Sequence, residues 1–260
     1  MKKALPIANG IALVITVIIN YLSNTGVFHD NTMAIVSARY PTLFTPAGYA
    51  FTIWIPIYLG LAGFVIYQGR SLAGNLEAGV AVQQISGWFI VSCLAICAWV
   101  LAWLYERTGL SVLIMLILLF SLTKIILRTD MELTDPPLRT IAAVWWPFCL
   151  YSGWITAALF ANLSAWLTKI RWAPYDRHQE FFTLAMIGVS AIAYLVMTWR
   201  RNMREYAFVG VWALIAIAIA DRHRSSTITW AAGIVAATLF ISSSLHGYKN
   251  RKYSPWRQRS

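Results

Sequence analysis

The side chains in this sequence that could bind another molecule are aromatic rings and an amide, placed at helical spacing within apolar segments. Trp154, Ala158 and Asn162 follow one another at intervals of four residues, so in a helix they lie near one face. A small residue between a Trp and an Asn leaves room for a flat guest molecule or for a closely packed second helix. Because an amide is costly in lipid, Asn162 should face inward and have a partner. The pattern therefore fits either a ligand pocket or helix packing.

A second aromatic group lies in the segment from Phe44 to Tyr58, FTPAGYAFTIWIPIY. Pro46 suits the first turn of a helix, where its missing N–H costs nothing. Pro56 should lie mid-helix and kink it. Trp54 and Tyr58 are four residues apart and share a helix face. This face is either the wall of an aromatic pocket or an ordinary packing surface.

Groups for other kinds of chemistry are missing from the apolar segments. No Asp or Glu lies deep inside any of them, and the four histidines fall in loops or at segment ends. Cys93, Cys97 and Cys149 lie in apolar runs, and a lone cysteine pair offers too few ligands for zinc. We therefore predict no catalytic residues, no metal site and no required cofactor.

The composition shows which elements must position the aromatic residues. The chain has 260 residues, 59% of them hydrophobic and only 12% charged, and soluble domains carry about twice that share of charge. A membrane-spanning helix needs roughly 20 apolar residues, and unbroken runs such as Val112 to Phe120 argue against a β-barrel. We predict an all-α integral membrane protein, a bundle of about eight transmembrane helices. They should lie at about residues 5–22, 46–68, 85–105, 110–127, 141–168, 181–199, 206–220 and 227–245.

The distribution of positive charge predicts the orientation. The first apolar segment follows Met1, Lys2 and Lys3 without a small-residue cleavage site, so we expect it to be a retained helix and not a signal peptide. With both termini on one side, that side carries about twice as many Lys and Arg residues as the other. This bias places both termini in the cytoplasm. It also explains the net charge of +11 without a nucleic-acid partner.

The aromatic patterns together resemble the tryptophan-rich sensory protein family (TspO/MBR), which includes the translocator protein or peripheral benzodiazepine receptor. The second helix of that family opens with an aromatic residue and x-Pro, then continues into Trp-x-x-x-Tyr. The chain matches with Phe44, Pro46, Trp54 and Tyr58. The fifth helix of the family carries Trp, Ala, Asn and Trp at intervals of four, and Trp154, Ala158, Asn162 and Trp166 match each one. In the third helix Trp99 and Trp103 match, whereas Ile96 stands where the family has Asn.

The resemblance covers the first five predicted spans. It implies that residues 1–172 form a five-helix membrane domain like the translocator-protein fold. Residues 173–260 would then add three transmembrane helices and a basic cytoplasmic tail. It suggests a homodimer in the lipid bilayer, and we expect the cytoplasmic (inner) membrane of a bacterium.

The resemblance also implies a function. The chain would be a membrane sensor or binding protein for flat hydrophobic ligands, a porphyrin or other tetrapyrrole or a sterol-like molecule, which it moves or regulates. The ligand-binding residues would be Pro46, Trp54, Tyr58, Trp99, Trp103, Trp154, Ala158 and Asn162. Arg39 in the first loop is a candidate partner for porphyrin carboxylates. The alternatives are a multi-span transporter of a small hydrophobic substrate and a scaffold subunit of a membrane complex. We expect no enzymatic activity, although a porphyrin-modifying reaction stays open.

Overall fold

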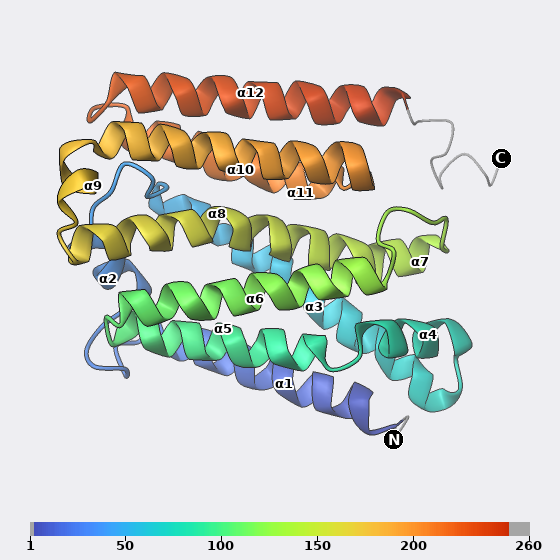
Figure 1. Ribbon diagram of the computed structural model, residues 1–260. Helices are drawn as coiled ribbons and strands as arrows, with labels where there is room; N and C mark the ends of the chain where they lie inside the picture. The colour runs from blue at the N-terminus through green and yellow to red at the C-terminus, as the bar shows by residue number, and fades with distance from the viewer. Residues whose placement is uncertain (1–2, 250–260) are drawn as a thin grey trace.

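The computed structural model describes residues 3–249 and shows a bundle of helices that run back and forth along one axis (Figure 1). The basic segment after Lys249, predicted to be a cytoplasmic tail, lies outside the described residues. The first and last long helices begin and end at the same end of the bundle (Figure 1). Within residues 3–249 the eight long helices are α1 (Ala4–Leu22), α3 (Trp54–Gly69), α5 (Trp88–Leu104), α6 (Thr108–Arg128), α8 (Trp146–Lys169), α10 (Gln179–Arg201), α11 (Arg204–Asp221) and α12 (Ser226–Lys249).

Most of these helices have the length and composition of membrane spans. Six stretches in the described chain qualify, or up to seven if α5 and the short helix α4 (Leu76–Ile85), which meet at a 54° bend, form one broken span. The remaining long helix, α11, includes Arg204, Glu205 and Asp221 at its ends and packs against α8 and α12. The prediction of an all-α multi-pass membrane bundle with about eight helices is confirmed.

Several short helices lie where the sequence indicated only polar loops. They are α2 (Met33–Arg39), α4 and α9 (Ala173–Arg177). The first two have side-chain N-caps: Thr32 accepts from the Ile35 N–H at 3.2 Å, and Asn75 accepts from the Ala78 N–H at 2.9 Å. The predicted third span began too early because the apolar pattern runs through the break at Ser86, which has a φ of 54°.

Prolines set the backbone of the two helices that carry the aromatic motifs. Pro46 lies before the 3₁₀ helix η1 (Gly48–Ile53) and not in its first turn, and Pro56 lies in the first turn of α3. Pro56 therefore does not lie mid-helix, where a kink was predicted. Instead, the backbone changes from 3₁₀ to α geometry at Trp54. Before α8, the chain forms α7 (Leu138–Thr140) and then a π-helical segment, η3 (Ile141–Trp145). Pro147 has no N–H to donate, so one backbone carbonyl in the turn before it loses its α-helical hydrogen bond. The wider π-helical turn accommodates this lost bond.

Helix α8 lies at the centre and joins the first four long helices to the last three. It contacts α3, α6, α10 and α11. The Tyr194 hydroxyl on α10 donates to the Gly153 carbonyl at 2.9 Å, and the hydroxyls of Thr156 and Tyr206 on α11 lie 2.5 Å apart. These bonds fasten α10 and α11 directly to α8. The division of the chain into domains at residue 172 stays a prediction.

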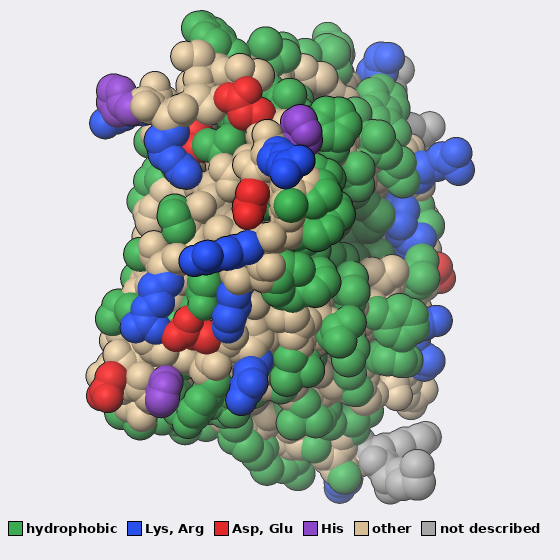
Figure 2. Space-filling model, turned by 60° about the vertical axis from the view of Figure 1, so that its left-hand side comes forward, with side chains coloured by type: hydrophobic (Ala, Val, Ile, Leu, Met, Phe, Trp, Pro, Cys, Tyr) green, Lys and Arg blue, Asp and Glu red, His purple; other side chains and the backbone are tan. Residues whose placement is uncertain are grey.

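Charged side chains gather at the ends of the bundle, and hydrophobic side chains cover its flank (Figure 2). The end that faces the viewer in Figure 2 is formed by α2, α9, the α5–α6 turn and the α11–α12 turn. The flank of α1 exposes aliphatic residues such as Ile11 and Ile18. In water this surface would be unfavourable, whereas in a bilayer it faces lipid chains. The charged residues in this end's loops and helix termini include Arg39, Glu106, Arg171, Arg177, Glu180, Arg222 and Arg224.

The close approach of α8 and α11 at Gly153 yields a test of this packing. A Cβ atom at Gly153 would lie 2.8 Å from the Tyr206 carbonyl oxygen, which is backbone and cannot turn aside. We expect Gly153→Ala to lower stability by about 1–3 kcal/mol through overpacking, measured as a lower thermal midpoint in detergent. Gly188→Ala on α10 is the matched control, because a Cβ there meets nothing within 4 Å. Equal midpoints for the two variants would contradict the packing of α8 on α11.

Candidate functional site

Asn162 is the centre of a buried hydrogen-bond group between α5, α6 and α8. Its side chain is 3% exposed. Its Oδ1 accepts from the Trp99 indole Nε1–H at 2.8 Å, and its Nδ2 donates to the Ser111 hydroxyl at 2.8 Å. The amide therefore has the inward orientation and the partners expected of an Asn in a span. Sequence reasoning missed Ser111, because a serine in an apolar helix carries no distinctive pattern.

The Trp99 ring continues this group toward Trp103. Their ring centroids lie 6.2 Å apart with the planes 19° from parallel. Both side chains are buried on α5. Two of the predicted ligand-binding tryptophans thus form one stacked pair, with Asn162 bonded to one of them.

Trp54 and Tyr58 form a second stacked pair on α3. Their centroids lie 5.3 Å apart at 21°, and the edge of Tyr151 from α8 meets Trp54 at 5.8 Å. The Tyr58 hydroxyl is buried and has no hydrogen-bond partner. Across the described residues, no ring contact joins this pair to Trp99 or Trp103.

The remaining predicted residues lie along α8 and at the entrance to α3. Trp154 is 2% exposed and meets the edge of the Phe51 ring at 5.8 Å. Ala158 is half-buried against the core, and Pro46 is half-buried ahead of η1. The structure thus places the eight residues in three neighbourhoods of α8 and does not bring them all into contact.

One aromatic residue that sequence reasoning missed comes from α11. The Trp212 indole donates to the Ala50 carbonyl of η1 at 3.0 Å, and its ring meets Tyr49 edge-on at 5.2 Å. The last three helices therefore also contribute to the aromatic surroundings of the second-helix motif. The signal that could have found it is a tryptophan in the middle of an apolar segment.

Two cavities of the described chain lie away from these rings. One, of about 600 Å³, is lined by Leu43 and by residues 176–181 and 184. The other, of about 300 Å³, is lined by residues of the α6–α7 loop, α11 and α12, among others. None of the eight predicted ligand-binding residues lines either cavity.

Arg39 does not point to a free anion site but belongs to an ion-pair group at the end of the bundle. Its Nη1 lies 2.5 Å from the Glu106 carboxylate, which also accepts from the Tyr40 hydroxyl. Lys169 donates to the Glu106 carbonyl. The Tyr40 hydrogen bond, together with the nearby Arg39 and Lys169 charges, lowers the pKa of Glu106. Burial and the Glu106 charge raise the pKa of Tyr40 to about 12.

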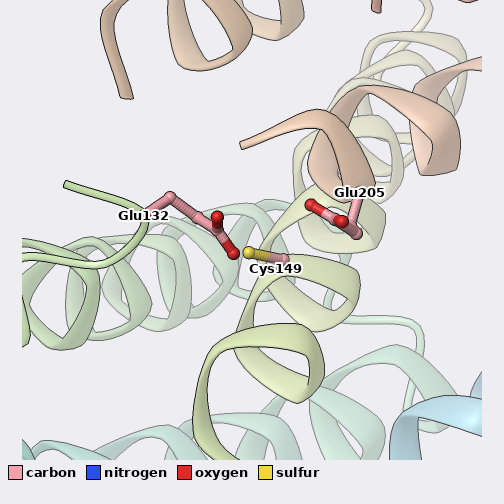
Figure 3. A group of neighbouring side chains, drawn as sticks. All are labelled: Glu132, Cys149 and Glu205. Atoms are coloured by element: carbon pink, nitrogen blue, oxygen red, sulfur yellow. The ribbon is translucent and has the colours of Figure 1, made fainter. Parts of the chain in front are cut away.

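A second group of polar side chains lies at the opposite end of the bundle. Glu132 follows α6, Cys149 lies on α8, and Glu205 lies in the first turn of α11 (Figure 3). Burial raises the pKa of Glu132 to about 8, and the nearby Glu205 carboxylate adds to the rise. Sequence reasoning missed this group because three separate segments supply it.

The comparison with known families shows to which family the chain belongs. A family model described as TSPO-like protein matches residues 6–245, which include all of the predicted site residues and most of α12. The chain belongs to the TSPO-like protein family. This TSPO-like membership confirms the resemblance seen in the motifs and supports a membrane sensor or binding protein in general. No curated protein and no solved structure gives a significant match.

The Asn162 group provides a stability test. Asn162→Ala removes the acceptor of the Trp99 indole N–H and a partner of Ser111, and neither group can turn to water. We expect a loss of about 1–3 kcal/mol, measured as a lower thermal midpoint of the purified protein. Ser121→Ala is the control, because that buried hydroxyl bonds to Leu118 within its own helix. If the two substitutions have the same small effect, Asn162 does not join the three helices.

The Glu106 group provides a pH test. A carboxyl whose pKa is lowered on folding adds stability above its unfolded pKa and loses that contribution as the pH falls through its folded pKa. We expect Glu106→Gln to lower stability by about 1 kcal/mol or less at pH 7. The difference from the wild type should shrink as the pH falls below the ordinary Glu value of 4.5 and through the lowered pKa of folded Glu106. Thermal midpoints from pH 7 to pH 3 measure this, with the exposed Glu77→Gln as control. A difference from the wild type that stays constant over this range would contradict the prediction.

Proposed function

We propose that this TSPO-like chain binds a flat hydrophobic molecule, a porphyrin or other tetrapyrrole or a sterol-like compound, beside Trp54 and Tyr58. The observation that carries the proposal is the Tyr58 hydroxyl, which is buried among aromatic rings without a hydrogen-bond partner. Such a group costs about 1–3 kcal/mol. A ligand with a polar edge would remove that cost by bonding to it.

The aromatic rings supply the remaining recognition. The faces of Trp54 and Tyr58 are nearly parallel, and Trp54 is half-buried. Three residues earlier, Phe51 is 39% exposed and meets Trp154 edge-on. A planar ligand could enter from the lipid at this point and stack on a ring face. Trp99, Trp103 and Asn162 would shape the inner wall, and Trp154, Ala158 and Pro46 the wall along α8.

The proposed role is sensing or regulated movement of the ligand, without a chemical reaction and without a required cofactor. We place the protein in a bacterial inner membrane with both termini in the cytoplasm, and as a homodimer, on the charge bias and the resemblance. Transport of a small hydrophobic substrate is the alternative that flux measurements in proteoliposomes would reveal.

A porphyrin titration tests the proposal. Protoporphyrin should quench the tryptophan fluorescence of the purified protein saturably. Tyr58→Phe removes the unpartnered hydroxyl, so we expect about tenfold weaker binding together with unchanged or higher thermal stability. Trp54→Ala should weaken binding further, because the stacking face is lost.

The matched control is Trp230→Phe on α12, whose side chain is 71% exposed on the lipid-facing side. This variant should keep the wild-type affinity. Affinity that is unchanged in Tyr58→Phe and Trp54→Ala, or absent from the wild type for both porphyrin and a sterol, would overturn the proposed function.

A further inference from the structure

Glu132, Cys149 and Glu205 place two carboxylates and a thiol around one point at an end of the bundle. One ligand atom from each lies within 4.8 Å of the other two. The Glu132 carboxylate and the Cys149 sulfur point toward each other, and Glu205 approaches from α11 (Figure 3). We propose that these three side chains bind a divalent transition-metal ion of the Zn²⁺ type.

The three ligands come from separate segments that the fold holds in place. Asn202, in a left-handed conformation at the end of α10, donates from its side chain to the Glu132 carbonyl at 2.9 Å. Cys149 is fully buried on the central helix α8. Glu205 lies in the first turn of α11, two residues after buried Met203. The site therefore depends on the contact of α8 with the last three helices.

Within the described chain, neither carboxylate forms a close ion pair. Among residues 3–249, no Lys, Arg or His nitrogen lies within 4.0 Å of a Glu132 or Glu205 oxygen. Glu132 Oε1 and Glu205 Oε2 are buried and form no hydrogen bond. Arg204 also lines the cavity beside these carboxylates and acts on Glu132 through its charge, and its Nη1 is 2.9 Å from where a Cβ of Gly247 would be. A divalent cation would supply further positive charge to two carboxylates that one arginine alone does not neutralise.

An independent observation points to a ligand here. The 300 Å³ cavity is lined by Glu132 and Glu205 and also by Ser243 of α12. The Ser243 side chain is 1% exposed, and its hydroxyl has no hydrogen-bond partner. A water molecule bound to the metal as fourth ligand would fit the cavity and could donate to this hydroxyl. Three protein ligands with one open position are typical of zinc sites that bind a further molecule.

The ligand set selects the class of metal. Mg²⁺ and Ca²⁺ prefer oxygen ligands, whereas a thiolate favours Zn²⁺ and similar ions. From the usual bond lengths, the ligand atoms of a tetrahedral zinc site lie roughly 3.3–3.6 Å apart. The three side chains would close in when the ion binds. The Cys149 S–H bond breaks, its proton leaves through the cavity to solvent, and a sulfur–metal bond replaces the thiol's 3.7 Å contact with Met131.

The metal proposal is independent of the proposed ligand function, because the two sites share no residue. Trp54→Ala should lose porphyrin affinity and keep metal binding. Glu132→Gln should lose metal binding and keep porphyrin affinity. Either proposal can therefore fail alone.

The experiment uses the full-length protein in detergent after treatment with a chelator. Calorimetric titration with ZnCl₂ should show one ion per chain, and zinc should raise the thermal midpoint. Glu132→Gln, Glu205→Gln and Cys149→Ser should each weaken binding at least tenfold. With Co²⁺ as the probe, the wild type should show a thiolate-to-cobalt absorption band that Cys149→Ser lacks.

Two control variants match the ligands in chemistry and surroundings. Asp135→Asn changes an exposed carboxylate in the same loop as Glu132, and Cys93→Ser changes a buried thiol on α5. Both should bind zinc as the wild type does. Helical circular dichroism establishes that each variant is folded, and Glu132→Gln carries the test if Cys149→Ser is not. Absence of stoichiometric binding to the wild type, or equal binding by the ligand and control variants, would overturn the site.

Discussion

The hydrogen bonds of Asn162 show the constraint on which this fold depends. Inside a bilayer a polar side chain cannot turn to water, so each buried polar group must find its partner on a neighbouring helix. Asn162 finds Trp99 and Ser111, and Asn9 of α1 donates to Gln68 of α3 at 2.8 Å. Because apolar surfaces alone do not distinguish one helix neighbour from another in lipid, these bonds select which helices pack together.

Some exceptions to this rule lie at the two proposed sites, and others, such as the hydroxyls of Ser71 and Thr183, lie elsewhere. The hydroxyls of Tyr58 and Ser243 and the carboxylates of Glu132 and Glu205 all have a buried atom without a partner. Each costs free energy in the unliganded protein, and each would be relieved by a bound molecule that offers the missing donor, acceptor or charge. A satisfied group such as Asn162 explains packing equally well without a ligand. An unsatisfied group that adjoins a cavity or an aromatic ring face is therefore the stronger indication of binding.

The sequence predicted the parts of this structure that repeat at helical spacing. Long apolar segments predicted the helices, and the four-residue spacing predicted that Trp54 and Tyr58 share a face. It did not predict α4, because Asn75, Glu77 and the glycines around them indicated a polar loop. It could not predict the Glu132–Cys149–Glu205 group, since only the tertiary contact of α8 with α11 and the α6–α7 loop brings three segments to one point. The spacing of residues along one helix can reveal ligands that share its face, but it cannot reveal ligands that three separate segments supply.

Both proposed sites use α8, and their positions along it determine how they relate. Cys149 lies near one end of the helix and Asn162 near the other, which at 1.5 Å per residue is a separation of about 20 Å. Cys149 packs beside the loop after α6, whereas Asn162 bonds to Ser111 near the start of α6. The metal site therefore lies toward one face of the membrane and the Asn162 group toward the other. Pro147 and the π-helical segment before it occur only at the Cys149 end. A shift of that end on metal binding could be absorbed there, while the regular helix beyond it keeps the aromatic residues in place.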